Sequence, residues 1–241
     1  MSFEKQQQAY RTSKPSLIGR GFERFTSPVG GALASMVPGG LVKGALKGID
    51  QAVGAPQLVK FDHDLSDLGA CNKAAERVAR AAKAVSGSTG AASGLGGIVT
   101  MGLDIPATIA VALRSIRDTG RAYGYDGKGP RERLFRLQVL ELASINKRDE
   151  RAKRIATLEE GIEADGNLSD ISPDDIEPII EQAVERVSRA IALALVRRRV
   201  GAAVPIVGSV IGGAVNVSFQ GDIGEAARFA FLERRLRAGG N

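Results

Sequence analysis

The sequence has very few of the residues that disulfides, metal centres and aromatic binding platforms require. It contains one cysteine (Cys71), one histidine (His63) and no tryptophan among 241 residues. A single cysteine excludes an internal disulfide framework and a cysteine-cluster zinc or iron–sulfur site. With only eight Phe and three Tyr, and with basic residues interleaved with acidic ones, the chain is also a poor candidate for nucleic-acid binding. We expect no nucleic-acid partner.

The overall composition is that of an ordinary globular protein with an excess of basic residues. Hydrophobic residues make up 44% and charged residues 25%, which argues against disorder over the whole length. The net charge of +6 favours anionic partners, among them anionic lipid. The first 16 residues are polar and lack the apolar region of a secretory signal. We expect a cytoplasmic protein, either free or peripheral at the inner face of the membrane, with a flexible N-terminal tail over residues 1–24 and one helical domain over 25–241.

Three uncharged segments, residues 25–42, 86–103 and 200–221, are unusually rich in glycine. Their lengths are near the ~20 residues that cross a bilayer, but Gly, Ala and Ser outnumber Leu, Ile and Phe. Small residues let two helix backbones approach closely. We therefore predict helices that pack tightly at the centre of one bundle. The alternative, which stays open at this point, is that these segments touch or enter a bilayer.

Helical periodicity governs the stretches between these segments. Apolar residues at spacings of three, four and seven predict a helix over 65–85, with Asp64 or Ser66 as its N-cap. Cys71 lies inside this helix, where a small buried hydrophobe is the better interpretation of it than a nucleophile.

Capping residues place four further helices. Asp104 and Pro106 predict a helix start, and Gly124 predicts its end. A long amphipathic helix follows over 130–164, with a break near 144–146. Ser172 caps a helix over 173–199, in which every acidic residue precedes every basic one, and the last helix is predicted to start at Asp222. Because no convincing strand pattern occurs, the sequence predicts an all-α, single-domain bundle of about seven or eight helices with Gly/Ala-rich helices at its centre.

Two clusters resemble metal sites and fail the test of ligand count or spacing. His63 lies between two aspartates, but a metal site needs three or four ligands and the chain has no second histidine. The loop 165–170 superficially matches a calcium loop, yet Asp170 and Ile176 stand where glycine and glutamate are needed. We interpret His63 as a surface residue near a helix cap and the loop as a helix connection, and we expect no metal, no cofactor and no catalytic residue.

The clearest charged motif is Arg197-Arg198-Arg199, which directly precedes the uncharged segment 200–221. Anionic headgroups attract such a cluster by about 1 kcal/mol per basic residue near the membrane surface. We predict these arginines as a lipid-headgroup site. The structural alternative is a favourable interaction of basic side chains with a helix C-terminus.

Two stretches of the sequence contain motifs whose order and approximate spacing resemble those of a known family. The first contains Leu103-Asp-Ile-Pro-Ala107, Leu113-Arg-Ser-Ile116, Tyr123-Gly-Tyr-Asp126 and Glu132-Arg-Leu-Phe135. The second contains Val204-Pro-Ile-Val-Gly208, Gly212-Gly-Ala-Val-Asn216 with Phe219, and a C-terminal motif from Ala226 to Arg234. Over about residues 45–237, the chain resembles the EcsC protein family.

The resemblance implies a membrane-linked accessory role, because the namesake of the family is encoded beside the two components of an ABC transporter. It implies no catalytic residues. The positions that match the family pattern are Asp104, Arg114, Tyr123, Gly124, Asp126, Glu132, Asn216 and Arg234. We expect Asp126 and Glu132 to pair with arginines. We further predict a buried polar network between the two Gly-rich segments, with Asp104, Arg114, Tyr123, Asp126, Asn216 and Arg234 as its candidate members, because a buried amide such as that of Asn216 needs partners.

Three functions follow as hypotheses. The first is a peripheral membrane or lipid-interacting accessory protein, linked to an ABC transporter and bound to anionic lipid or to a membrane protein. The second is a soluble helical adaptor for a protein partner. The third, less favoured, is an enzyme that uses carboxylates such as Asp104 and Asp126, with or without a metal. The sequence does not predict the oligomeric state.

Overall fold

The computed structural model describes residues 2–13, 39–48, 54–93, 101–145, 147–200 and 208–239. For residues 39, 41, 47, 88–93, 101–105, 195–200 and 208–216 the description covers the backbone alone. In these ranges the chain forms eight α-helices: α1 (Phe3–Thr12), α5 (Gly39–Lys47), α7 (Leu68–Ser93), α8 (Met101–Ala122), α9 (Pro130–Ser144), α10 (Arg148–Glu160), α11 (Pro173–Val200) and α12 (Gly208–Arg237). The only β-type pairing in the same ranges is an isolated antiparallel bridge between Ile162 and Leu168. The predicted all-α bundle is confirmed.

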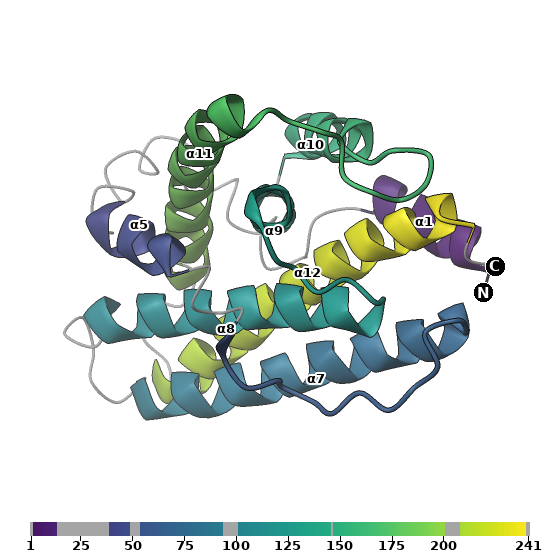
Figure 1. Cartoon of the computed structure of the whole chain (residues 1–241). Helices are drawn as coiled ribbons and strands as arrows, with labels where there is room; N and C mark the ends of the chain where they lie inside the picture. The colour runs from purple at the N-terminus through teal and green to yellow at the C-terminus, as the bar shows by residue number, and fades with distance from the viewer. Residues whose placement is uncertain are drawn as a thin grey trace.

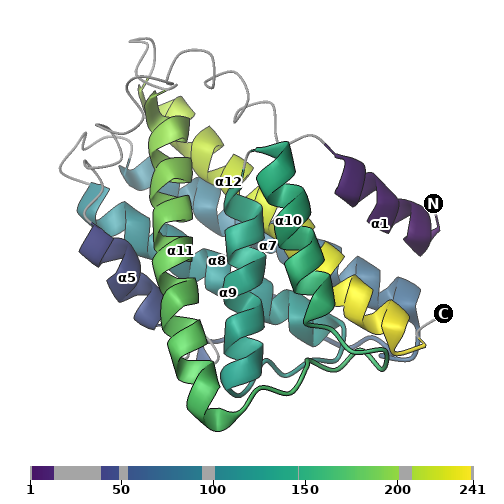
Figure 2. The same ribbon diagram turned by 90° about the horizontal axis from the view of Figure 1, so that it is seen from above.

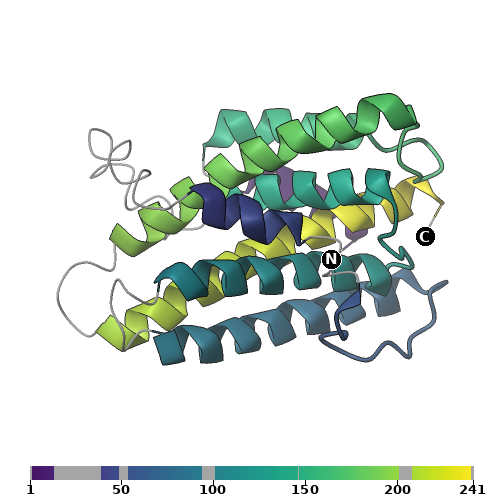
Figure 3. The same cartoon turned by 60° about the vertical axis from the view of Figure 1, so that its left-hand side comes forward.

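The helices pack in two layers. In the first layer α7, α8 and α12 lie alongside one another, and in the second α9 packs between α10 and α11, with α5 against α11 (Figures 1 and 3). The long helix α12 also packs on α9, and α5 packs on α8, so these contacts join the layers. Helix α1 lies on the outside against α12, and Figure 2 shows it beside the C-terminal end of the chain.

The core lies between the layers, and α9 is its most enclosed helix. From Leu134 to Ser144 every residue of α9 except Gln138 is buried. A helix enclosed on all sides normally carries apolar residues all round. This one also buries Arg136 and Glu141, so its charges need partners from neighbouring elements.

The Gly-rich segments are described in part. Segment 25–42 is described only from residue 39, where α5 begins. Segment 86–103 supplies the end of α7 and the start of α8, and segment 200–221 supplies the last residue of α11 and the first half of α12. Where they are described, these segments are helical, and the remainder of this prediction lies outside the described residues.

Helices α7 and α12 approach each other through small residues. A Cβ atom built on Gly224 of α12 would lie 2.9 Å from the Cβ of Ala79. Two turns further along the antiparallel pair, a Cβ built on Gly87 would lie 3.4 Å from Cγ2 of Val217. Larger side chains at these positions would push the helices apart. The contact of Gly87 with Val217 joins segments 86–103 and 200–221, so the predicted close packing of these two segments is confirmed at this point.

Local signals located the end of α8, the break between α9 and α10 and the start of α11 correctly. Helix α8 ends in a Schellman motif: Gly124 has φ +90°, its N–H donates to the carbonyl of Arg121 (3.0 Å), and the N–H of Tyr125 donates to the carbonyl of Gly120 (2.9 Å). The break predicted near 144–146 falls between α9 and α10. Ser172 caps α11, because its Oγ accepts from the N–H of Asp175 at 3.2 Å.

Three predicted helix starts were wrong. The N-cap of α7 is Asp67, whose carboxylate accepts from the N–H of Ala70 at 3.0 Å; Asp64 accepts from the N–H of Ser66 instead and closes a turn. Helix α8 starts three residues before Asp104 and carries Pro106 inside it. A proline is well tolerated in the first turn of a helix, where its missing N–H has no helical partner, and it can be accommodated further inside at a cost of about 3 kcal/mol, so it indicates the neighbourhood of a helix start and not its first residue.

The third correction concerns the last helix. It starts at Gly208, well before Asp222, so the uncharged segment and the charged C-terminal stretch form one helix of 30 residues. Glycine disfavours a helix by about 1 kcal/mol per residue, which is why the sequence suggests a break. Packing of this stretch against α7 outweighs that local preference.

Candidate functional site

Arg234 of α12 is the centre of the most enclosed cluster of family-pattern residues. Its side chain is 3% exposed. Its Nη1 donates to Oε1 of Glu132 at the start of α9 (2.8 Å), and its Nε donates to the carbonyl of Gly166 in the α10–α11 connection (3.0 Å). The predicted pairing of Glu132 with an arginine is confirmed, and Arg234 joins three separate parts of the chain.

Aromatic rings enclose the same guanidinium. Its carbon lies 3.7 Å from the ring centroid of Tyr125 and 5.1 Å from that of Phe135. Phe231 packs edge-on against Phe135 with centroids 5.3 Å apart. Burial raises the pKa of Tyr125, and the positive charge of Arg234 opposes that rise. Because protein atoms surround the guanidinium, this arrangement locks elements together and is not built to receive a substrate.

A second buried charge pair lies on α8 and was not foreseen as a pair. Arg117 and Asp118 are both fully buried, and Nε of Arg117 donates to Oδ1 of Asp118 at 2.7 Å. The other carboxylate oxygen accepts from the N–H of Leu58 at 2.7 Å. Arg114, one helical turn earlier, donates to the carbonyl of Pro56 at 2.8 Å. These side chains hold the irregular segment that precedes α7 onto the surface of α8.

The spacing of these residues contained the signal that sequence reasoning missed. Arg114, Arg117 and Arg121 recur at three and four residues and therefore share one face of a helix. That shared basic face was the available signal, and the segment that it binds is decided only by the tertiary structure.

The remaining candidates for the polar network lie in separate contacts. Tyr123 is fully buried, and its hydroxyl donates to Oδ1 of Asn72 on α7 at 2.9 Å. Asp126 is exposed, accepts from the N–H of Lys128 at 2.9 Å and lies 3.6 Å from the ammonium of that lysine, so its partner is a lysine and not the arginine we expected. Within the described residues no contact joins Arg114, Tyr123, Asp126 and Arg234 to one another.

Asp104 and Asn216 are described by their backbone. Asp104 lies in the first turn of α8 and Asn216 in the first half of α12, and these two helices pack against each other. Their side chains lie outside the described residues, so a polar network between them stays a prediction.

The residues that resembled metal or nucleophilic sites have structural partners. His63 Nε2 lies 2.8 Å from the carbonyl of Ala122 at the end of α8. Cys71 is a buried free thiol whose pKa is raised by burial. The carboxylate of Asp165 accepts from the N–H of Asn167 at 2.9 Å, which lowers its pKa and stabilises the loop. In the ranges that are described, no three His, Cys, Asp or Glu side chains are grouped closely enough to hold a metal ion.

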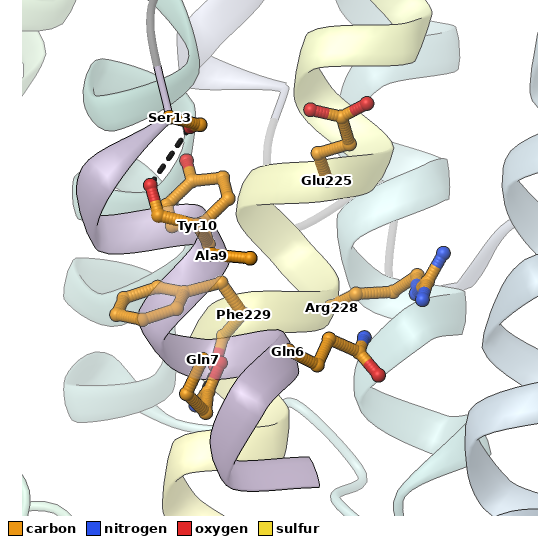
Figure 4. A pocket seen from close by; sticks show the side chains of 8 residues that line it. All are labelled: Gln6, Gln7, Ala9, Tyr10, Ser13, Glu225, Arg228 and Phe229. Carbon is orange, nitrogen blue, oxygen red and sulfur yellow. Dashed lines mark hydrogen bonds between the residues drawn. The ribbon is translucent and has the colours of Figure 1, made fainter. Parts of the chain in front are cut away.

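Helix α1 forms one wall of a cavity of about 320 Å³ against α12 (Figure 4). Tyr10 stacks on Phe229 with ring centroids 4.5 Å apart, and Gln7 donates to the carbonyl of Phe229 at 3.0 Å. Arg11 contacts both Glu159 of α10 (2.8 Å) and Glu233 of α12 (2.9 Å). Residues 3–12 of the expected flexible tail thus form a helix that packs on the bundle.

One end of the bundle gathers the described parts of two uncharged segments. Helix α7 ends, α8 begins, α11 ends and α12 begins on the same side of the molecule, at the left of Figure 3. The predicted lipid-headgroup residues 197–199 lie in the last turn of α11 at this end; their side chains lie outside the described residues. Among the helices described, none combines the length and the apolar character that a membrane crossing needs.

Comparisons with known proteins agree with the resemblance seen in the motifs. The model of the EcsC protein family matches residues 4–236. The chain is 23% identical to Protein EcsC of Bacillus subtilis over 222 residues, which are 90% of this chain and 88% of that protein. It is 29% identical to the uncharacterized protein YdbA of the same organism over 153 residues, 61% of this chain and about half (51%) of YdbA.

No solved structure matches the chain significantly. The family model, in contrast, extends from α1 to the last turn of α12 and takes in the motif residues that meet around Arg234. The chain therefore belongs to the EcsC protein family.

Proposed function

We propose that this protein binds the surface of anionic membranes as a peripheral accessory protein, through the end of the bundle at which α7 and α11 end and α8 and α12 begin. One observation carries the proposal: uncharged, Gly-rich helix ends from distant parts of the sequence gather there, and three consecutive arginines close α11 at the same end.

The physical argument combines two weak attractions. Each arginine near an anionic surface contributes about 1 kcal/mol, so residues 197–199 would contribute about 3 kcal/mol, or roughly 100-fold in affinity. The described helix ends at residues 86–93, 101–103 and 208–221 carry no charged residue, so contact of this end with the interface costs little desolvation of charge. The resemblance to a family whose namesake is encoded beside an ABC transporter extends the proposal to an accessory role at such a transporter.

Co-sedimentation with vesicles tests the proposal. The full chain is mixed with vesicles of phosphatidylcholine alone and with vesicles that also contain phosphatidylglycerol. We expect binding to the anionic vesicles only, and binding about 100-fold weaker for the triple variant Arg197→Gln, Arg198→Gln, Arg199→Gln.

A matched variant separates this site from net charge. Lys60, Lys128 and Arg131 are exposed basic residues near the opposite end of α8 and the start of α9. Their replacement by glutamine removes the same charge, and we expect it to leave vesicle binding nearly unchanged. Equal loss in both triple variants would contradict a localised site, and no binding to either vesicle would favour the alternative role as an adaptor for a protein partner.

A further inference from the structure

A groove of about 680 Å³ lies between α10, α11 and the end of α9 and is lined by five basic side chains. Three come from the α9–α10 connection and α10 (Lys147, Lys153, Arg154), and two from α11 (Arg186, Arg189). This groove plays no part in the contacts described above. Its positive charge depends on how many carboxylates neutralise these residues.

Two arginines of the groove share one carboxylate at its floor. Glu141 of α9 is 6% exposed, and its Oε1 lies 3.1 Å from Nε of Arg154 and 3.6 Å from Nε of Arg186. Burial raises the pKa of Glu141, and the two arginines oppose that rise. Among the described residues neither arginine is paired with another acidic group. Two positive charges thus face one buried negative charge.

Arg189, the other basic residue that α11 contributes to the groove, also shares its carboxylate with a second cation. Glu185 pairs with Arg189 at 3.2 Å and also with Lys43 of α5, so it too serves two cations. Lys153 forms no ion pair within the part of the chain that the structure describes. Lys147 alone has a carboxylate to itself, that of Glu150 at 3.1 Å. The groove therefore carries a surplus of positive charge concentrated on Lys153, Arg154 and Arg186.

Apart from Ser144, whose hydroxyl donates to the carbonyl of Leu140, the uncharged lining of the groove is apolar. Ile145 closes the end of α9, and Ala190 and Leu193 lie one and two turns after Arg186 on α11. Residues 186, 190, 193 and 197 share one face of α11, so this face runs from the groove toward the end of the bundle at Arg197. A basic cluster beside an apolar strip matches a phosphorylated group on an apolar carrier.

We propose that this groove binds a phosphoryl group, held by Lys153, Arg154 and Arg186. A guanidinium presents several N–H donors in a plane and suits phosphate oxygens, and the lysine adds a point charge. The phosphoryl group can belong to a lipid headgroup or to a soluble phosphate. Its lipid form deepens the proposed function, while phosphate binding itself does not depend on that function.

Titration calorimetry with inorganic phosphate at constant ionic strength tests the groove in the full chain. We expect a Kd of about 1 mM or tighter, which is about −4 kcal/mol for a five-atom anion. The variant Lys153→Gln, Arg186→Gln is expected to bind at least about tenfold more weakly. The control Lys128→Gln, Arg131→Gln removes the same charge and is expected to bind like the unmodified chain. Circular dichroism and thermal unfolding establish that each variant is folded.

Vesicles then distinguish the two sources. Phosphatidic acid exposes a phosphate monoester with more than one negative charge near neutral pH, whereas phosphatidylglycerol carries a diester with one, so the two kinds of vesicle are compared at equal surface potential. The unmodified chain is expected to prefer phosphatidic acid if the ligand is a lipid. In that case the double variant Lys153→Gln, Arg186→Gln loses the preference but still binds phosphatidylglycerol. Phosphate binding without that preference assigns a soluble ligand.

Failure of this inference is distinct from failure of the proposed function. If inorganic phosphate does not bind and phosphatidic acid is not preferred, the groove is only a solvated charged surface and the inference is overturned. Vesicle binding that depends on Arg197, Arg198 and Arg199 would survive that result. Conversely, if the protein binds inorganic phosphate but binds none of the vesicles, the phosphate site in the groove is supported and the membrane proposal is refuted.

Discussion

Substitution Arg234→Ala tests whether the motif residues of this family serve to lock the fold. The guanidinium of Arg234 pairs with Glu132, donates to the carbonyl of Gly166 and lies against the ring of Tyr125. Truncation at Cβ removes all three contacts. It also leaves the carboxylate of Glu132 without its cation in a site that is largely shielded from water.

The expected loss of stability is large. Removal of one partner from a buried ion pair costs about 3–5 kcal/mol, because the other charge stays buried and unpaired. Glu132 keeps 15% of its side-chain surface exposed, so solvent relieves part of that cost. The lost cation–π contact contributes up to about 2 kcal/mol when desolvated. We therefore expect about 3–5 kcal/mol in total, out of the ~5–15 kcal/mol that typically stabilises a folded domain.

Guanidinium chloride unfolding followed by circular dichroism measures this loss. In thermal unfolding the same loss corresponds to roughly 6–20 °C for a domain of this size. A double-mutant cycle with Glu132→Leu isolates the pair, and we expect a coupling energy of more than about 1 kcal/mol between the two positions. The control is Arg131→Ala, which removes an ion pair to Asp170 with side chains 49% and 91% exposed; its expected cost is below about 1 kcal/mol.

The reasoning is refuted if Arg234→Ala costs no more than Arg131→Ala, or if the cycle shows no coupling with Glu132. Arg234→Lys refines the test, because lysine keeps the charge but loses the planar fork that reaches Glu132 and Gly166 together. We expect its stability to lie between those of the unmodified chain and the alanine variant.

Three further predictions rest on other contacts. Gly166→Ala is expected to destabilise the fold much more than Gly129→Ala. Both glycines have positive φ (+79° and +86°), but a Cβ on Gly166 would collide with the carbonyl oxygen of Arg234, whereas nothing lies within 4 Å of a Cβ on Gly129. Equal urea midpoints for the two variants would contradict the structure. The buried thiol of Cys71, with its raised pKa, is expected to react with Ellman's reagent only after unfolding, and fast reaction of the native protein at neutral pH would refute its burial. Burial raises the pKa of Glu141 above its ordinary value of 4.5, so the folded state binds a proton more readily than the unfolded state. Relative to Glu141→Gln, the unmodified chain should therefore gain stability as the pH falls through that raised pKa. A difference in unfolding free energy between the two proteins that stays constant with pH would exclude the shift.

The cluster around Arg234 gives a physical meaning to several residues of the family pattern. Tyr125, Glu132 and Arg234 come from different motifs, and they meet in one enclosed place where each satisfies another. Their contacts are therefore accounted for by folding alone. Residues that serve binding are better sought at exposed charged surfaces, such as the groove between α10 and α11.

The sequence by itself determined the fold class and several helix boundaries. Helical periodicity, the Ser172 cap and the Gly124 stop are properties of a few neighbouring residues, so they can be read without knowing the rest of the molecule. The errors arose where local preference and packing disagree. Glycines in 208–221 disfavour a helix locally, but their small size allows α12 to lie against α7, and the packing prevails.

Only the tertiary structure decided which charges are paired. Arg234 and Glu132 are 102 residues apart in the sequence, and Asp118 and Leu58 are 60 apart. Such pairings depend on how the helices are arranged in space, and no spacing along the chain encodes that arrangement. The same holds for the groove of Lys153, Arg154 and Arg186, because its surplus charge exists only where two helices bring their cations around one buried carboxylate.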